Sequence, residues 1–285
     1  MKHIILLFLL VISVSFSPLM AQQNTQVTPE QLALFPKSTT YVVTDNNPMS
    51  GYNIAIKSSI EKFWKITPFK FISPGEFDNI RNKRENSFIL LTKVNLTKDK
   101  REAEYWYLNL LMGDKVYSIN DLPEILTLPL DYTGVDENSY TYKIGVMIRF
   151  AQEHVKAMLA SKKITKFRNL KMYNSNIKDI KNKTLLLEES DLAEEVNSLD
   201  KIKAIYPYPV KIVSSDAIEK AVLEQTPNTL ILHQISPGED DNIGRSYKII
   251  YGVDDNKIYY YNYENISAKR PSGMLARDFQ RIAGK

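Results

Sequence analysis

The sequence contains no cysteine, and this absence excludes disulfide bonds, thiolate nucleophiles and cysteine-ligated metals. Glycine is scarce, with 10 residues in 285, and the chain has no phosphate-binding glycine loop, dinucleotide fingerprint or Gly-x-Ser-x-Gly elbow. His154 and His233 are the only histidines after the N-terminal segment, and they do not form the short-spaced pair of a metal motif. The common catalytic and cofactor motifs are therefore missing, and we expect no cofactor and no metal site.

Long apolar runs are also missing beyond the N-terminus. Residues 1–21 begin with Lys2, continue with an apolar stretch over 4–14 and end at Ala21, which is typical of a secretory signal peptide. This stretch is shorter than the ~18 apolar residues of a membrane-spanning helix, and no later segment approaches that length. We therefore predict an exported protein, periplasmic or extracellular, without a transmembrane segment after cleavage. The alternative is an uncleaved N-terminal anchor.

The charge balance is close to neutral, with 37 basic and 33 acidic residues. A formal charge of +4 is too small to indicate a polyanion from the total alone, and no nucleic-acid partner is expected. A hydrophobic content of 44% is sufficient for real cores, and the length fits two domains of ordinary size.

The chain carries an internal repeat. Three segments return in the same order: 68–73 (PFKFIS) as 209–214 (PVKIVS), 86–90 (NSFIL) as 228–232 (NTLIL), and 114–117 (DKVY) as 256–259 (NKIY). Matches in a constant order indicate a tandem duplication of one structural unit. We predict a signal peptide at 1–21, a lead-in at 22–37, unit 1 at 38–161, a basic linker at 162–183 and unit 2 at 184–285.

Hydrophobic patterning predicts the same elements in each unit. In unit 1 we expect strands at 40–43, 69–72 and 88–94, a hairpin of 105–112 with 115–119, and a long amphipathic helix over 144–159. We also expect a helix that begins at Asn47-Pro48 and carries Trp64 on its apolar face, and a second helix from the Ser73–Glu76 capping box to about residue 85. Trp106 is expected in the core as well.

Unit 2 follows the same plan. Its expected strands are 185–187, 210–213 and 230–234, followed by a hairpin of 247–251 with 257–261. Its expected helices cover 191–204, a segment from Ser214 to about 225, and 274–282. The fold class is therefore α/β (α+β), a tandem β-α-β-α-β-β-β-α unit in which each mixed sheet ends in an antiparallel hairpin.

A second repeat register competes with the first. Residues 72–76 (ISPGE) also return almost unchanged as 235–239, at a longer offset. That register would pair Ser73 with Ser236 and a helix with a loop, whereas the first register pairs Ser73 with Ser214 and keeps all elements aligned. We prefer the first.

Two sets of side chains are candidates for ligand binding. The basic stretch at 162–183 could contact an anionic polymer or lipid headgroup, although a solvated linker explains it as well. In a regular strand Tyr259, Tyr261 and Tyr263 would share one face of the sheet, where they could stack on sugar rings or simply pack against neighbouring strands. The candidate binding residues are Lys162, Lys163, Lys166, Arg168, Lys171, Tyr259, Tyr261 and Tyr263.

Carboxylates are the remaining catalytic candidates. Glu76 with Asp78, and the run 239–241 (EDD), are the densest groups, but Glu76 fits a helix cap and the run fits a solvated loop. Calcium could in principle bind residues 240–242 and 254–256, although the calcium-loop spacing is absent. We predict no catalytic residue from these patterns.

The element order resembles that of thioredoxin-like domains and of the N-terminal domain of TolB-type periplasmic proteins. The Cys-x-x-Cys of the first group has no counterpart here, so the resemblance implies no redox role. Residues 64–73 (WKITPFKFIS) resemble uncharacterised exported bacterial proteins, which implies export but no activity. We expect an exported, non-enzymatic binding or envelope-assembly protein, whose partner is another envelope protein, a glycan or an anionic polymer. The alternatives are a carboxylate-dependent glycan hydrolase and a module that binds glycans or anionic polymers.

Overall fold

The computed structural model describes residues 26–95, 103–161, 170–237 and 244–284. Unit 1 has the order β-α-β-α-β-β-β-α, and unit 2 repeats it, as the sequence predicts. The elements of unit 1 are β1 (Thr39–Val43), α2 (Gly51–Phe63), β2 (Phe69–Ile72), α3 (Pro74–Ile80), β3 (Asn86–Asn95), β4 (Glu104–Met112), β5 (Glu124–Tyr132) and α4 (Ile144–Ala160). Those of unit 2 are β6 (Thr184–Leu187), α5 (Leu199–Lys203), β7 (Val210–Ile212), α6 (Ser215–Glu224), β8 (Thr229–Ile235), β9 (Arg245–Gly252), β10 (Ile258–Asn265) and α7 (Ala276–Ile282).

Each unit forms a five-stranded mixed sheet, and the two sheets share one strand order. The first is β2-β1-β3-β4-β5, and the second, read from the matching edge, is β7-β6-β8-β9-β10. The first three strands of each unit run parallel and the last two add antiparallel. Strands β2 and β7 therefore occupy equivalent edge positions in the two sheets. Ser73 and Ser214 each follow this edge strand and precede the second helix of their unit. Ser236 follows the central strand β8 instead, so the strand order favours the first repeat register.

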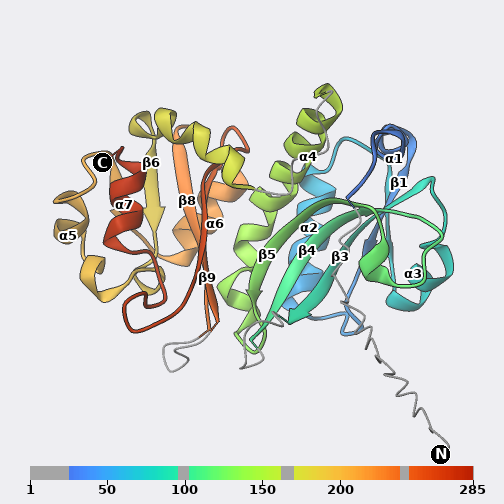
Figure 1. Cartoon of the computed structure of the whole chain (residues 1–285), viewed down its shortest axis with the longest axis horizontal. Helices are drawn as coiled ribbons and strands as arrows, with labels where there is room; N and C mark the ends of the chain where they lie inside the picture. Colours follow the sequence, from blue (N-terminus) through green and yellow to red (C-terminus); the bar gives the residue numbers. More distant parts are fainter. Residues whose placement is uncertain (1–25, 96–102, 162–169, 238–243, 285) are drawn as a thin grey trace, which may run out of the picture.

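The two sheets lie in a stack of five layers (Figure 1). Helix α3 covers the outer face of the first sheet, where Phe77 packs edge-on against Phe88 with ring centroids 5.0 Å apart. Helices α2, α4 and α6 lie between the sheets, and α5 and α7 cover the far face of the second sheet. The middle layer therefore belongs to both units.

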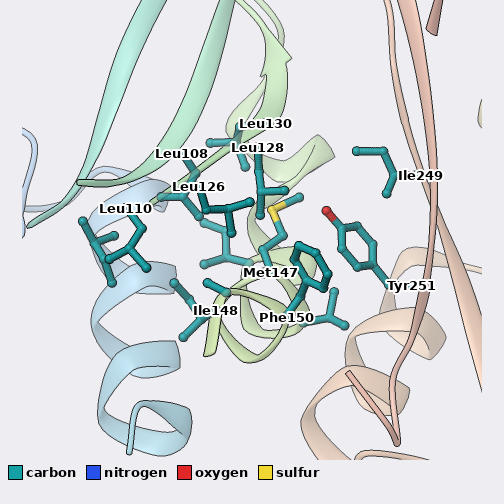
Figure 2. Close-up of a cluster of buried hydrophobic side chains, with 14 of the residues drawn as sticks. Leu108, Leu110, Leu126, Leu128, Leu130, Met147, Ile148, Phe150, Ile249 and Tyr251 are labelled. Carbon is teal, nitrogen blue, oxygen red and sulfur yellow. The ribbon is translucent and has the colours of Figure 1, made fainter. Parts of the chain in front are cut away.

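Helix α4 joins the two cores (Figure 2). Met147 and Phe150 lie between the leucines of β4 and β5 on one side and Ile249 and Tyr251 of β9 on the other. All five labelled leucines and these four side chains belong to one buried cluster, and the Phe150 and Tyr251 rings meet edge-on at 6.0 Å. Burial of apolar area is the main stabilising term in folding, so the units share a core rather than merely touching.

One predicted hairpin is wrong. Residues 115–119 form no strand, and β4 pairs instead with β5, which begins at Glu124. The reason lies in the backbone of the expected turn, because the Gly113 amide donates to Asn86 O at 2.9 Å and the Asp114 amide donates to Arg81 O at 3.1 Å. These bonds hold the turn region against the end of α3 and the start of β3. The chain therefore continues to Glu124 before it forms the strand that pairs with β4.

Helix boundaries also differ from the predictions. Helix α2 is capped by Ser50, whose hydroxyl accepts from the Asn53 amide at 3.2 Å, rather than by Asn47. Helix α3 ends at Ile80, short of residue 85. The expected helix over 191–204 is broken into the end of the short turn η7 (Glu189–Asp191), the turn η8 (Glu194–Val196) and the five-residue helix α5 at 199–203. Short polar stretches of this kind carry little periodicity.

The expected lead-in and linker are packed parts of the fold. Residues 26–37 contain α1 (Pro29–Leu32) and η1 (Phe35–Lys37), and both Leu32 and Phe35 are buried against unit 1. Residues 170–182 form η6 (Leu170–Asn182), which packs along β10. Of the helices in the described part of the chain, none has the length and apolar character needed to cross a membrane.

Candidate functional site

The topology of each sheet defines a crevice where ligands commonly bind. In the second sheet β6 lies between β7 and β8. The chain leaves the carboxyl end of β6 toward β7 and the carboxyl end of β8 toward β9, so these two connections run in opposite directions. Open α/β sheets bind ligands at such switch points, outside the carboxyl ends of the strands. The side chains at and beyond the carboxyl ends of β6, β7 and β8 are therefore the first candidates for a site.

A cavity of about 260 Å³ lies at this switch point, and its walls come from both units. Unit 2 supplies residues after β6 and β7 and at the end of β8, and unit 1 closes the cavity with Asp131 near the end of β5 and with residues that follow it. The lining residues are Asp131, Val135, Asn138, Ser139, Tyr142, Glu188, Ser190, Asp191, Ser215, Gln234 and Ser236. The lining thus holds three carboxyl groups, several hydroxyls and no basic side chain.

Lys143 lies next to this cavity and links the units. Its ammonium is 1% exposed and lies 3.2 Å from Glu188 Oε2 and 3.3 Å from Asp191 Oδ2. Burial by itself favours the neutral amine, but Asp191, Tyr142 and Glu188 outweigh it and raise the pKa of Lys143. The Tyr142 hydroxyl donates a short hydrogen bond to the same Glu188 carboxylate. One lysine of unit 1 therefore holds two carboxylates of unit 2 in place.

Asp131 and Asp191 at the cavity have raised pKa values. Burial raises the pKa of Asp131 to about 6, although the Ser139 hydroxyl and the Tyr132 amide both donate to its carboxylate. Burial also raises the pKa of Asp191 to about 6, against the opposing effect of Lys143. Both groups are ionised at neutral pH, so the lining carries net negative charge there.

His233 lies behind the cavity on β8 and contributes no charge. Its side chain is 1% exposed, and burial, assisted by the charge of Lys143, lowers the pKa of His233 to about 3. His154 is similar, because burial lowers its pKa to about 4 while its Nδ1 contacts the Tyr173 hydroxyl at 2.7 Å. Both histidines are neutral core residues at physiological pH.

The predicted basic site is only partly described. Lys162, Lys163, Lys166 and Arg168 lie outside the described residues. Lys171 is the second residue of the η6 segment, and its ammonium lies 5.0 Å from the centre of the Tyr263 ring.

The predicted tyrosine row is wrong in its geometry. A β-bulge between Ile258 and Tyr260 shifts the alternation of β10 by one residue, so Tyr259 and Tyr260 pack into the unit 2 core while Tyr261 faces the shared core. Only Tyr263 of the three candidates is exposed, at 40%, whereas Tyr259 and Tyr261 are buried. A register change of one residue moves a side chain to the opposite face, and here it places Tyr259 on the face opposite Tyr261 and Tyr263, whose rings still meet edge-on at 6.2 Å.

The other carboxylate candidates have structural partners. Glu76 and Ser73 form the predicted capping box, with the Ser73 amide donating to Glu76 Oε2 at 2.8 Å. Residues 239–241 lie outside the described part of the chain. Asp254 pairs with Lys183 at 2.6 Å, and Asp255 accepts from the Tyr259 hydroxyl at 2.6 Å. No metal-binding cluster of His, Asp or Glu occurs among the residues that the structure describes.

Sequence reasoning missed the residues of the interunit cavity. Asp131, Lys143, Glu188 and Asp191 are scattered singly over 61 positions and form no motif. One signal was available, because Glu188 directly follows β6, and the strand order predicted by the repeat places that position at a switch point. Searches with this chain found no matching family model, no matching curated protein and no matching solved structure.

Proposed function

We propose that this chain is an exported binding protein, and that its interunit cavity holds a small, hydroxyl-rich ligand with a protonated amine, such as an amino sugar. The observation that carries the proposal is the acidic lining at the switch point between the units. Carboxylates accept hydrogen bonds from hydroxyls and ammonium groups, and serine hydroxyls also donate to the hydroxyls of a ligand. The three carboxyl groups of the lining outnumber the single adjacent ammonium of Lys143, which favours a cationic ligand. A cavity of about 260 Å³ suits a ligand somewhat smaller than a typical drug.

Binding is favoured over catalysis because each carboxylate is tied to a partner. Glu188 and Asp191 are held by Lys143, and Asp131 is held by Ser139. Such contacts orient acceptors for a ligand and reduce the reorganisation that binding requires. An amine arriving in the cavity would find these acceptors already in place.

Glucosamine and glucose form a matched pair of probes, since they differ by one amine. Calorimetry should detect glucosamine binding that strengthens by about tenfold from one unit below pH 6 to one unit above it, as Asp131 and Asp191 lose their protons. Glucose should bind weakly at every pH. The Asp131→Asn variant should flatten the pH dependence for glucosamine, whereas Asp200→Asn, an exposed carboxylate on α5, should leave it unchanged.

Equal affinity for the two sugars, or no binding of either, would overturn the proposal. The same follows if Asp200→Asn and Asp131→Asn have equal effects, because the response would then reflect total charge rather than the cavity.

Glycan hydrolysis is a second candidate, because burial raises the pKa of the Asp131 carboxyl group. A carboxyl with a pKa near 6 can act as a general acid, and Asp131 has that property. A hydrolase would release product from chromogenic glycosides, and Asp131→Asn would abolish turnover while it retained sugar binding. Absence of turnover in the unaltered protein removes this candidate and leaves the binding proposal intact.

A further inference from the structure

Unit 1 has a cavity at the position that corresponds to the interunit cavity of unit 2. Strands β1 and β3 match β6 and β8 in the strand order, and a cavity of about 360 Å³ lies at the carboxyl end of β1, beside the middle of β3. Its lining residues are Val43, Thr44, Asp45, Asn46, Tyr52, Pro74, Phe77, Asp78, Leu90, Leu91, Trp106 and Ile119. The same fold rule therefore indicates a second ligand site.

The lining of this cavity is apolar and aromatic, with carboxylates at its mouth. Phe77, Leu90 and Tyr52 are almost fully buried, and Trp106 is half-buried rather than a core residue as its sequence position suggests. Asp45 and Asp78 are exposed, and the lining includes no lysine or arginine. Such a combination suits a ligand with an apolar body and a positively charged end.

Tyr52 supplies an independent sign of a missing ligand group. The side chain is 2% exposed, and among the described residues its hydroxyl has no hydrogen-bond partner. Buried polar groups are nearly always hydrogen-bonded, and leaving one without a partner destabilises the fold. Burial is the largest cause of the raised pKa of Tyr52, and the nearby Tyr140 and Asp45 raise it further. Tyr52 and Asp45 both line the cavity, so the unsatisfied hydroxyl belongs to a residue of the same site.

The wall that carries Asp45 is fixed before any ligand arrives. The Asn53 side chain accepts from the Asp45 amide at 2.8 Å and donates to the carbonyls of Asp45 and Asn47 at 3.0 and 2.7 Å. Asn53 is itself buried in α2. A preorganised wall avoids the entropy cost of ordering a loop on binding.

Trp106 restricts where the charge of the ligand can go. Lys93 already holds its ammonium 4.8 Å from the Trp106 ring centre and pairs with Glu104 at 3.3 Å. A second ammonium over that ring would meet Lys93. The charged end of the ligand therefore belongs at Asp45 and Tyr52, and its apolar body belongs against Phe77 and Leu90.

We propose that the unit 1 cavity binds a small organic ammonium compound, an aryl- or alkylamine, whose ammonium donates to Asp45 and to the Tyr52 hydroxyl oxygen. This site is separate from the interunit cavity and does not depend on the function proposed for it.

Phenethylamine, phenylethanol and phenylpropionate are matched probes with a positive, neutral and negative end. The protein has two tryptophans, so its two indole N–H signals in an NMR spectrum can be assigned with a Trp106→Phe variant. Phenethylamine should shift the Trp106 signal in a saturable way and leave that of buried Trp64 unmoved. Phenylethanol should bind several-fold more weakly, and phenylpropionate should not bind.

Three variants separate this site from a general charge effect. Asp45→Asn should weaken phenethylamine binding about tenfold or more, because it removes a charge-assisted hydrogen bond. Asp200→Asn and Asp131→Asn should leave that binding unchanged, and the second also distinguishes this site from the interunit cavity. Equal binding of all three probes, or loss of phenethylamine binding in Asp131→Asn, would overturn the proposal.

Tyr52→Phe tests the role of the hydroxyl without risk to folding. Removal of an unsatisfied buried hydroxyl should leave the melting temperature equal to or above that of the unaltered protein. The same variant should bind phenethylamine several-fold more weakly. A lower melting temperature with unchanged affinity would show that the hydroxyl serves the fold and not the ligand.

Discussion

Lys143 links the two units through buried ion pairs. It is almost fully buried, and its partners Glu188 and Asp191 come from the other unit. Removing one member of a buried ion pair leaves an uncompensated charge, which is strongly destabilising. The sequence gives no hint of this role, because nothing in the pattern around residue 143 differs from an ordinary helix start.

Lys143→Met should lower the free energy of unfolding by about 3–5 kcal/mol at neutral pH. The loss should be smaller in acid, because the pKa of Asp191 is already raised by burial and will rise further once the ammonium is gone. When folding raises the pKa of an acid, the protein loses stability as the pH rises from the unfolded-state pKa through the folded-state pKa. The stability deficit of Lys143→Met relative to the unaltered protein therefore grows as the pH rises through about 6. Urea unfolding at several pH values measures this effect.

The double variant Lys143→Met with Asp191→Leu is the control for the charge argument. It removes the uncompensated carboxylate as well, so it should recover part of the lost stability and most of the pH dependence. If the double variant is as unstable as the single one, packing rather than charge is the important term at this position.

Single residues that act locally were predictable, and those that act across the fold were not. The Ser73–Glu76 capping box and the buried Trp64 follow from neighbours within four positions. Asp131 and Glu188 acquire their environment from strands that are distant in sequence. Local propensity contains no information on such contacts, and only the fold brings them together.

At the scale of elements, the η6 segment protects an open edge of the second sheet. Strand β10 is at the edge, where unpaired backbone groups would invite association with other chains. The Asn174 side chain accepts from the Tyr261 amide at 2.7 Å and donates to Tyr261 O at 3.1 Å, which imitates a neighbouring strand. The side-chain amide of Asn176 donates a further hydrogen bond to Ile258 O at 2.8 Å.

Asn174→Ala should therefore leave the Tyr261 amide without its partner and destabilise the fold by about 1–3 kcal/mol. Hydrogen exchange at Tyr261 should become faster, and the protein should aggregate more readily. The exposed neighbour Asn182 provides a matched control, and its change to alanine should affect neither measurement. Equal exchange rates at Tyr261 in both variants would contradict the protective role.

Element order was predictable because hydrophobic patterns repeat in the two halves, but three local features were not. The true partner of β4 begins at Glu124, since backbone bonds at Gly113 and Asp114 divert the expected turn. The bulge in β10 reverses the faces of the tyrosines. The η6 segment looks like a charged linker because only Leu170 and Ile180 of its thirteen residues are buried. Each difference arises from tertiary contacts that periodicity does not report.

At the scale of the whole molecule, the shared middle layer should make the two units unfold together. Phe150→Ala would open a cavity beside Tyr251 and should cost about 3–5 kcal/mol. The loss should appear in the slowest-exchanging amides of β8 and β9 as much as in those of β3 and β4. Met172→Ala, at an exposed position, should change neither set.

Retention of wild-type exchange in β8 and β9 of the Phe150→Ala variant would show that unit 2 is stable by itself. In that case the shared core would be a contact between independent domains, and the Lys143 cluster would be the main link between them.

The position of α4 in the chain has a consequence for how the protein is made. The side chains of α4 that face unit 2 stay uncovered until β9 has left the ribosome, about a hundred residues later. At about 5–20 residues per second, that interval lasts roughly 5–20 s. During this time the nascent chain presents an apolar helix without its cover, so we expect holding chaperones to bind it transiently at Met147 and Phe150.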